Sequence, residues 1–145
     1  MRNSIFSDLE RFKEKGSFEF KQTDVLSKVC NAPNDSSGIY LVFADKISDD
    51  SVIYIGISGR EGERGKIIHR EDGLGGRIVK GKQFGIARRN SWPLKMKADN
   101  IKTLYVKWFV TYGKYDQIIP RPIENAYLEL ILQKDGMLPM WNKEV

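Results

Sequence analysis

Two short apolar runs separated by a polar segment constrain the fold of this chain most strongly. Residues 39–43 and 52–57 are rich in β-branched and aromatic side chains, and residues 45–51 between them are polar. Apolar runs of this length and composition with a polar break between them are typical of two antiparallel strands joined by a loop. The sequence therefore predicts a β-hairpin.

Further elements are predicted on both sides of this hairpin. Side chains alternate over residues 104–112, which predicts a third strand. Helical spacing in residues 5–12 predicts a short N-terminal helix, and Pro122 can open a second helix that Gly136 ends. We expect an α+β fold with a small antiparallel sheet of about three strands, flanked by helices.

The chain has the size of a single domain. Its 145 residues suffice for one ordinary core. Turn-forming residues over 31–38 divide the chain into an N-terminal helical extension (residues 1–35) and a main domain (residues 36–145). Residues 59–73 are rich in glycine and charge, which predicts an exposed insertion. No apolar run reaches the length of about eighteen residues needed for a membrane span, so we expect a protein that does not bind membranes. No secretory signal is recognisable, and Cys30 has no second cysteine with which to form a disulfide. We therefore expect a cytoplasmic protein.

Positive charge is concentrated in the middle of the chain. Residues 56–97 contain eleven basic and four acidic residues, whereas the net charge of the whole chain is +5. Such a segment suits a polyanion such as nucleic acid, but composition alone equally allows a solvated basic surface. The candidate DNA-binding residues are Arg60, Arg64, Lys66, Arg70, Lys80, Lys82, Arg88 and Arg89.

The two strands of the predicted hairpin carry related tripeptides. Residues 38–40 are Gly-Ile-Tyr, and residues 54–56 are Tyr-Ile-Gly. This pair resembles the signature of the GIY-YIG nuclease family, in which two hairpin strands bring both tyrosines to one catalytic surface. The resemblance implies a GIY-YIG-like domain that hydrolyses phosphodiester bonds in DNA, with Tyr40 and Tyr54 in its active site.

Three later segments repeat the remaining elements of the family pattern in order. Residues 74–78 (Leu-Gly-Gly-Arg-Ile) resemble the family's Leu-x-x-Arg-aliphatic helix. Residues 124–128 (Glu-Asn-Ala-Tyr-Leu) resemble its Glu-Asn run, and residues 139–142 (Pro-Met-Trp-Asn) resemble its Pro-x-x-Asn ending. The resemblance therefore adds Arg77, Glu124 and Asn142 to the catalytic set.

Two choices within this pattern stay open, and one position departs from it. Arg64 lies nearer to the second tripeptide than Arg77 but lacks flanking aliphatic residues, and Glu129 is an alternative to Glu124. Many family members carry a histidine or tyrosine four residues after the arginine, where this chain has Gly81. His69 or a neighbouring lysine could replace that side chain.

The resemblance also implies a division of roles. Tyr40 acts as general base, Tyr54 and Asn142 orient the reacting groups, Arg77 contacts the phosphate, and Glu124 holds one Mg²⁺ or Mn²⁺ per active site. Independent chemistry agrees, because Mg²⁺ takes oxygen ligands and the forked donors of arginine suit phosphate oxygens. We expect a metal-dependent DNA endonuclease, for which a homodimer is one possible assembly. The alternative is a non-catalytic nucleic-acid-binding module on the same fold.

Overall fold

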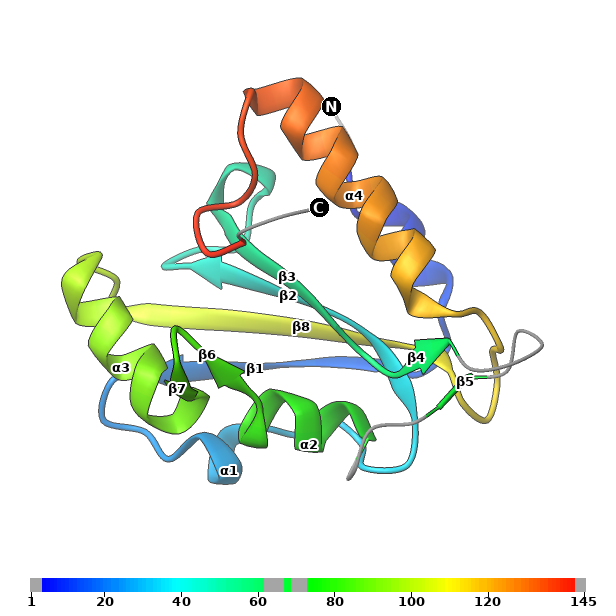
Figure 1. Cartoon of the computed structure of the whole chain (residues 1–145), viewed down its shortest axis with the longest axis horizontal. Coiled ribbons are helices and arrows are strands. Elements are labelled where there is room, and N and C mark those ends of the chain that lie inside the picture. The colour runs from blue at the N-terminus through cyan, green and yellow to red at the C-terminus, as the bar shows by residue number, and fades with distance from the viewer. Residues whose placement is uncertain (1–3, 62–66, 69–72, 143–145) are drawn as a thin grey trace.

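A four-stranded antiparallel sheet forms the centre of the molecule (Figure 1). The computed structural model describes residues 4–61, 67–68 and 73–142. The strands of the sheet are β1 (Lys15–Lys21), β2 (Ser37–Ala44), β3 (Val52–Ser58) and β8 (Thr103–Tyr112), in the spatial order β1-β8-β2-β3. All neighbouring strands are antiparallel. The predicted α+β class and antiparallel sheet are confirmed, as are the hairpin and the strand over residues 104–112.

The sheet has one strand more than the sequence analysis predicted. Residues 15–21 form β1, which pairs with β8 along its whole length, and from residue 4 onward only a short 3-10 turn, η1 (Ser7–Arg11), precedes it. The prediction of a helical extension over residues 1–35 is therefore wrong, because this segment supplies an edge strand of the main sheet. The overlooked signal is the alternation of buried Phe18 and Phe20 with exposed polar neighbours.

Helices and two small hairpins complete the fold. The helices are α1 (Leu26–Val29), α2 (Gly73–Lys80), α3 (Arg88–Ala98) and α4 (Pro120–Asp135), and a 3-10 turn η2 (Asp49–Ser51) lies between β2 and β3. The small hairpins pair β4 (Arg60–Glu61) with β5 (Ile67–Ile68), and β6 (Lys82–Gln83) with β7 (Ile86–Ala87). The predicted insertion around residues 59–73 contains β4 and β5 and lies partly outside the described residues. None of the helices described is both long and apolar enough to cross a membrane.

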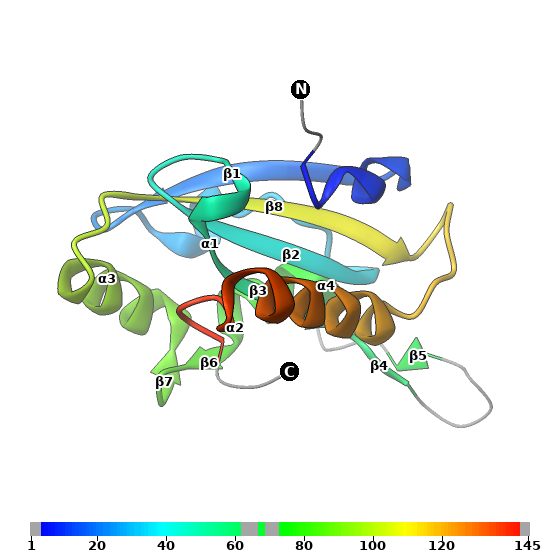
Figure 2. The same ribbon diagram turned by 90° about the horizontal axis from the view of Figure 1, so that it is seen from above.

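The two faces of the sheet bury different helices. Side chains alternate along β2, so that Ile39 and Leu41 pack in a cluster with α4 and the N-terminal turn, whereas Tyr40 and Val42 pack in a cluster with α2 and α3. Figures 1 and 2 show α4 on one side of the sheet and α2 and α3 on the other. Because both faces are covered, β2 is apolar and buried over nearly its whole length.

The glycine of the second tripeptide makes room for the tyrosine of the first. Tyr40 lies opposite Gly56 in the β2–β3 pairing. A methyl group at residue 56 would overlap the ring of Tyr40 and come within 2.7 Å of the Tyr54 ring. Only glycine therefore allows the two rings, with centroids 5.9 Å apart, to pack together across β3. The pairing of tyrosine with glycine thus has a packing reason of its own.

Candidate active site

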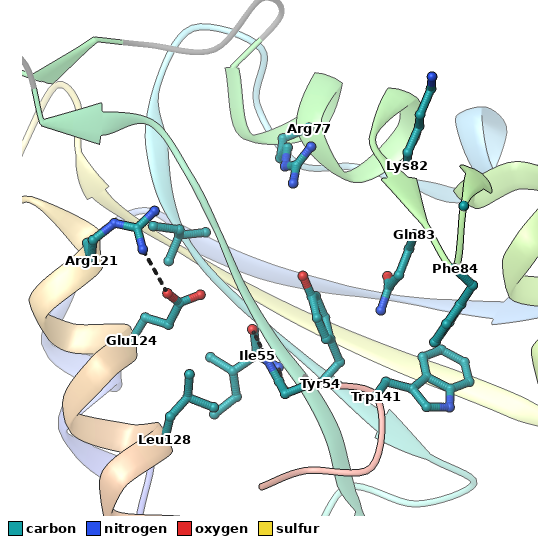
Figure 3. A pocket seen from close by; sticks show the side chains of 13 residues that line it. Tyr54, Ile55, Arg77, Lys82, Gln83, Phe84, Arg121, Glu124, Leu128 and Trp141 are labelled. Atoms are coloured by element: carbon teal, nitrogen blue, oxygen red, sulfur yellow. Dashed lines mark hydrogen bonds and ion pairs between the residues drawn. The ribbon is translucent and has the colours of Figure 1, made fainter. Parts of the chain in front are cut away.

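A pocket of about 480 Å³ lies beside β3, the edge strand of the sheet (Figure 3). Its walls come from β3, α2, the β6–β7 hairpin, α4 and the C-terminal residues 141–142. Helices on opposite faces of a sheet can meet only beyond its edge, and β3 provides that edge. The pocket thus gathers side chains from both layers of helices.

Four of the five predicted catalytic residues line this pocket. They are Tyr54 on β3, Arg77 on α2, Glu124 on α4 and Asn142 in the C-terminal segment. Figure 3 shows Arg77 and Glu124 approaching from opposite sides of β3. The helical phase of α4 also separates the two candidate glutamates. Glu124 lines the pocket together with Leu128, one turn later, whereas Glu129 is exposed to solvent on another face.

The α2 side of the pocket presents hydrogen-bond donors. The Nε atom of Arg77 and the Nε2 atom of Gln83 are buried and have no hydrogen-bond partner among the described residues. Lys82, next to Gln83, is exposed at the same pocket. Buried donors are normally satisfied, so unsatisfied ones beside a pocket favour a ligand rich in acceptors. Arg64, the alternative to Arg77, lies outside the described residues, and Gln83 was not predicted as a site residue.

The opposite wall carries a carboxylate in an unfavourable environment. Burial raises the pKa of Glu124, and the charge of Arg121 opposes this shift only in part. The two side chains form a loose ion pair, with Arg121 Nη1 lying 4.0 Å from Glu124 Oε1. The ionised form of Glu124 would therefore gain from a cation in the pocket.

Tyr40 does not fit the role of general base that the family resemblance implied. Its side chain is fully buried on the α2–α3 face of the sheet, and it does not line the pocket. Burial raises the pKa of the Tyr40 hydroxyl, with the nearby Arg88 charge acting in the opposite direction. A phenolate at this position is strongly disfavoured. The phenol that lines the pocket is Tyr54.

Asn142 holds the backbone of β3 rather than the tyrosine hydroxyls. Its Oδ1 atom accepts a hydrogen bond of 2.9 Å from the Ile55 N–H, and its Nδ2 atom donates one of 3.0 Å to the Ile55 carbonyl. The preceding N–H of Trp141 donates to the Ile53 carbonyl at 2.7 Å. The C-terminal segment thus pairs with the outer edge of β3 in the manner of another strand. The predicted link from Asn142 to the tyrosines is not seen.

Arg88 was predicted as a DNA contact, and this prediction is wrong because the side chain is fully buried. A methyl group at Gly81 would collide with Arg88 Nη1, so the guanidinium occupies the space beside the position that lacks the expected histidine or tyrosine. Its Nη2 atom lies 3.4 Å from the Tyr54 hydroxyl oxygen. No local sequence signal distinguishes a buried arginine from the exposed Arg89 beside it. His69 lies outside the described residues.

The other predicted DNA contacts are distributed over the surface. Lys80, Lys82 and Arg89 are exposed. Lys82 borders the candidate active site, while Lys80 and Arg89 line a second pocket of about 700 Å³ against α1. Arg60 belongs to β4, and the remaining residues of this set lie outside the described part of the chain: Arg64, Lys66 and Arg70.

A divalent cation would find one carboxylate in this pocket. Glu124 is the only acidic residue among the described residues that line it, and no cluster of three or more His, Cys, Asp or Glu side chains occurs in the described ranges. Mg²⁺ is commonly held by one or two carboxylates, with waters and substrate phosphates as its other ligands. The donor set therefore fits Mg²⁺ or Mn²⁺ shared with a phosphate substrate.

Comparisons with models of protein families, with curated proteins and with solved structures find no match to this chain.

Proposed function

We propose that this protein is a metal-dependent DNA endonuclease of the GIY-YIG type, with its active site in the pocket beside β3. The observation that carries the proposal is the meeting of Tyr54, Arg77, Glu124 and Asn142 in one pocket, from four separate segments of the chain. The family pattern contains these residues by their sequence spacing alone, which does not depend on the fold. An accidental resemblance gives no reason for them to share a site.

The α2 side of the pocket would bind the phosphodiester. Arg77 offers permanently charged, forked donors to the non-bridging oxygens, and Gln83 Nε2 adds a neutral donor. Donors that are already fixed in place stabilise the extra negative charge that forms on the phosphate in the transition state. Lys82, exposed at the rim, would contact a neighbouring phosphate of the backbone.

On the other wall, Glu124 would hold the divalent cation. With the cation held there, phosphate charge would be neutralised and a bound water would become more acidic. In the hydrolysis, the water oxygen bonds to phosphorus while the bond from phosphorus to the leaving oxygen breaks. The attacking water loses one proton, and the leaving oxygen gains one. Tyr54 is the phenol on the pocket wall, so we assign to its hydroxyl, which can donate and accept, the contact that orients this water.

Cleavage assays test the proposal directly. Supercoiled plasmid and single-stranded DNA are incubated with the protein in Mg²⁺, Mn²⁺ or EDTA. We expect cutting that requires a divalent cation and falls by about 100-fold or more in Glu124→Ala, since a metal ion contributes several kcal/mol to such a reaction. Glu129→Ala is the matched control, because it removes the same charge from an exposed face of α4 and should cut normally.

A folded protein that leaves every substrate intact in all three conditions would refute the endonuclease proposal. If that protein still retards DNA on gels in a salt-sensitive manner, the function is nucleic-acid binding without catalysis. Equal losses of cutting in Glu124→Ala and Glu129→Ala would place the cation elsewhere. Tyr40→Phe adds a further check, because the buried Tyr40 should be dispensable for the chemical step, whereas Tyr54→Phe should lower the rate.

A further inference from the structure

Arg88 is a buried cation, and no acidic side chain in the described part of the chain forms an ion pair with it. It is the only charged residue among the fully buried side chains of the described chain. Its guanidinium instead lies 5.6 to 5.8 Å from the ring centres of Tyr40, Tyr54 and Trp92. Burying a charge is costly unless a partner compensates it. The fold therefore keeps this arginine at a cost.

Arg88 donates three hydrogen bonds, and two of their acceptors have a second donor. Its Nε atom donates to Gln83 Oε1 at 2.9 Å, but that oxygen also accepts from the Trp92 indole N–H at 2.9 Å. Its Nη1 atom donates to the Arg77 carbonyl at 2.6 Å, and that carbonyl also accepts from the Gly81 N–H at 3.0 Å. Both acceptors would stay satisfied without Arg88. All three partners line the pocket, and the third, the Tyr54 hydroxyl, is the group to which we assign the contact with the reacting water.

We propose that Arg88 is a positioning residue of the candidate active site. It donates a hydrogen bond to the Tyr54 hydroxyl from the buried side, away from the pocket, and keeps a fixed positive charge beside the Tyr54 oxygen. This inference rests on the proposed endonuclease function. Arg88 does not itself line the pocket, so it acts through Tyr54 and not on the substrate. Because the Tyr54 oxygen accepts a hydrogen bond from Arg88, its own proton is left for the water in the pocket. The positive charge of Arg88 favours negative charge on that oxygen during the reaction.

Steady-state cleavage kinetics of Arg88→Met test this role. Methionine fills a similar apolar volume between the rings but donates nothing. We expect kcat to fall by about 10- to 100-fold, the usual effect of losing a hydrogen bond from a charged donor, with KM for DNA unchanged. Arg88→Lys should recover part of kcat. Arg88→Met combined with Tyr54→Phe should be no slower than Tyr54→Phe alone, because the two side chains act as a unit.

The control variant is Lys21→Met, which removes one positive charge from an exposed position on β1, away from the pocket, and should cut like the wild type. A rise in KM for Arg88→Met with no fall in kcat would overturn the inference, because it would assign Arg88 to DNA binding. Full additivity of the Arg88→Met and Tyr54→Phe effects would also overturn it.

Unfolding of Arg88→Met by urea, without DNA or metal, separates this inference from the proposed function. We expect the variant to be as stable as the wild type or more stable, because no acceptor is orphaned and a buried charge is removed. A large loss of stability would overturn the inference by showing that Arg88 serves the fold. If the wild type cuts no DNA, the endonuclease proposal fails, and the urea midpoint still shows whether Arg88 is kept for the fold or for the pocket.

Discussion

Replacing Asn142 with alanine should loosen the outer edge of β3. In the structure, the side-chain amide takes the place of a strand peptide unit, accepting from the Ile55 N–H and donating to the Ile55 carbonyl. Ile55 is fully buried, and β3 has no further strand beyond it in the described sheet. The truncation therefore removes the hydrogen-bond partners of the Ile55 N–H and the Ile55 carbonyl at once. It also weakens the neighbouring hydrogen bond from the Trp141 N–H to the Ile53 carbonyl, because Asn142 no longer holds the C-terminal segment against β3.

The size of the effect follows from these two bonds. A buried donor or acceptor left without a partner costs about 1–3 kcal/mol. Water can enter through the pocket that Ile55 and Asn142 both line, so the lower half of this range applies to each group. We expect a loss of about 2–4 kcal/mol in the free energy of unfolding, a large part of the ~5–15 kcal/mol of a typical domain. The corresponding drop in Tm is about 5–15 °C.

Urea titration followed by far-ultraviolet circular dichroism, at pH 7 without divalent cations, measures this loss. Asn90→Ala, an exposed asparagine on α3, is the control and should change stability by about 0.5 kcal/mol or less. Asn142→Asp keeps the acceptor but removes the donor, so it should be unstable at pH 7 and recover at acidic pH, where a protonated carboxyl can donate again. A loss below about 0.5 kcal/mol for Asn142→Ala would refute the role of the amide as a strand substitute.

Three further predictions follow from the packing and the titratable groups. Gly56→Ala should lower the free energy of unfolding by about 1–3 kcal/mol, because the added methyl group overlaps the Tyr40 ring. Measured by urea unfolding, this loss should be smaller when Gly56→Ala is combined with Tyr40→Val. Equal losses with Tyr40 and with valine at that position would contradict the packing argument. Because the pKa of Glu124 is raised in the folded state, the contribution of its carboxyl to stability is complete below the ordinary pKa of 4.5 and is lost as pH rises through the folded-state pKa. Glu124→Gln should therefore be more stable than the wild type at pH 7 but not at pH 4. Added Mg²⁺ should stabilise only the wild type. Burial raises the pKa of the Cys30 thiol, so maleimide labelling at pH 7 should be at least about tenfold slower in the native protein than in urea, and equal rates would show an exposed thiol.

Local sequence patterns predicted three strands of the main sheet and α4, but neither β1 nor α3. The hairpin and β8 have unbroken β-rich runs, and α4 has an opening proline and a closing glycine, so each is specified by its own residues. The strand β1 was missed because Gly16 and three charged residues dilute its alternation. Its stability comes from pairing with β8, which lies far away in the sequence. Such non-local pairing leaves little trace in a short window.

The site shows the same division between local and non-local information. Glu124 could be preferred over Glu129 from the sequence, because the apolar residues of α4 fix which face is turned inward. By contrast, the burial of Tyr40 depends on the face of β2 that α2 and α3 cover, and the burial of Arg88 depends on the gap left by Gly81. The residues next to Tyr40 and Arg88 in the sequence do not specify that these two side chains are buried. The roles predicted for Tyr40 and Arg88 therefore needed correction.

The order of strands in the sheet also sets an order of events during synthesis. The β2–β3 hairpin joins neighbouring segments and can form as soon as it leaves the ribosome. The edge strand β1 is translated before the other three strands, yet its only partner in the described sheet is β8, which lies between β1 and β2. Most of the chain must therefore be made before β1 can pair. Until β8 has been synthesised, β1 remains unpaired and exposes its phenylalanine side chains. Exposed strands of this kind are prone to aggregate and are shielded by chaperones.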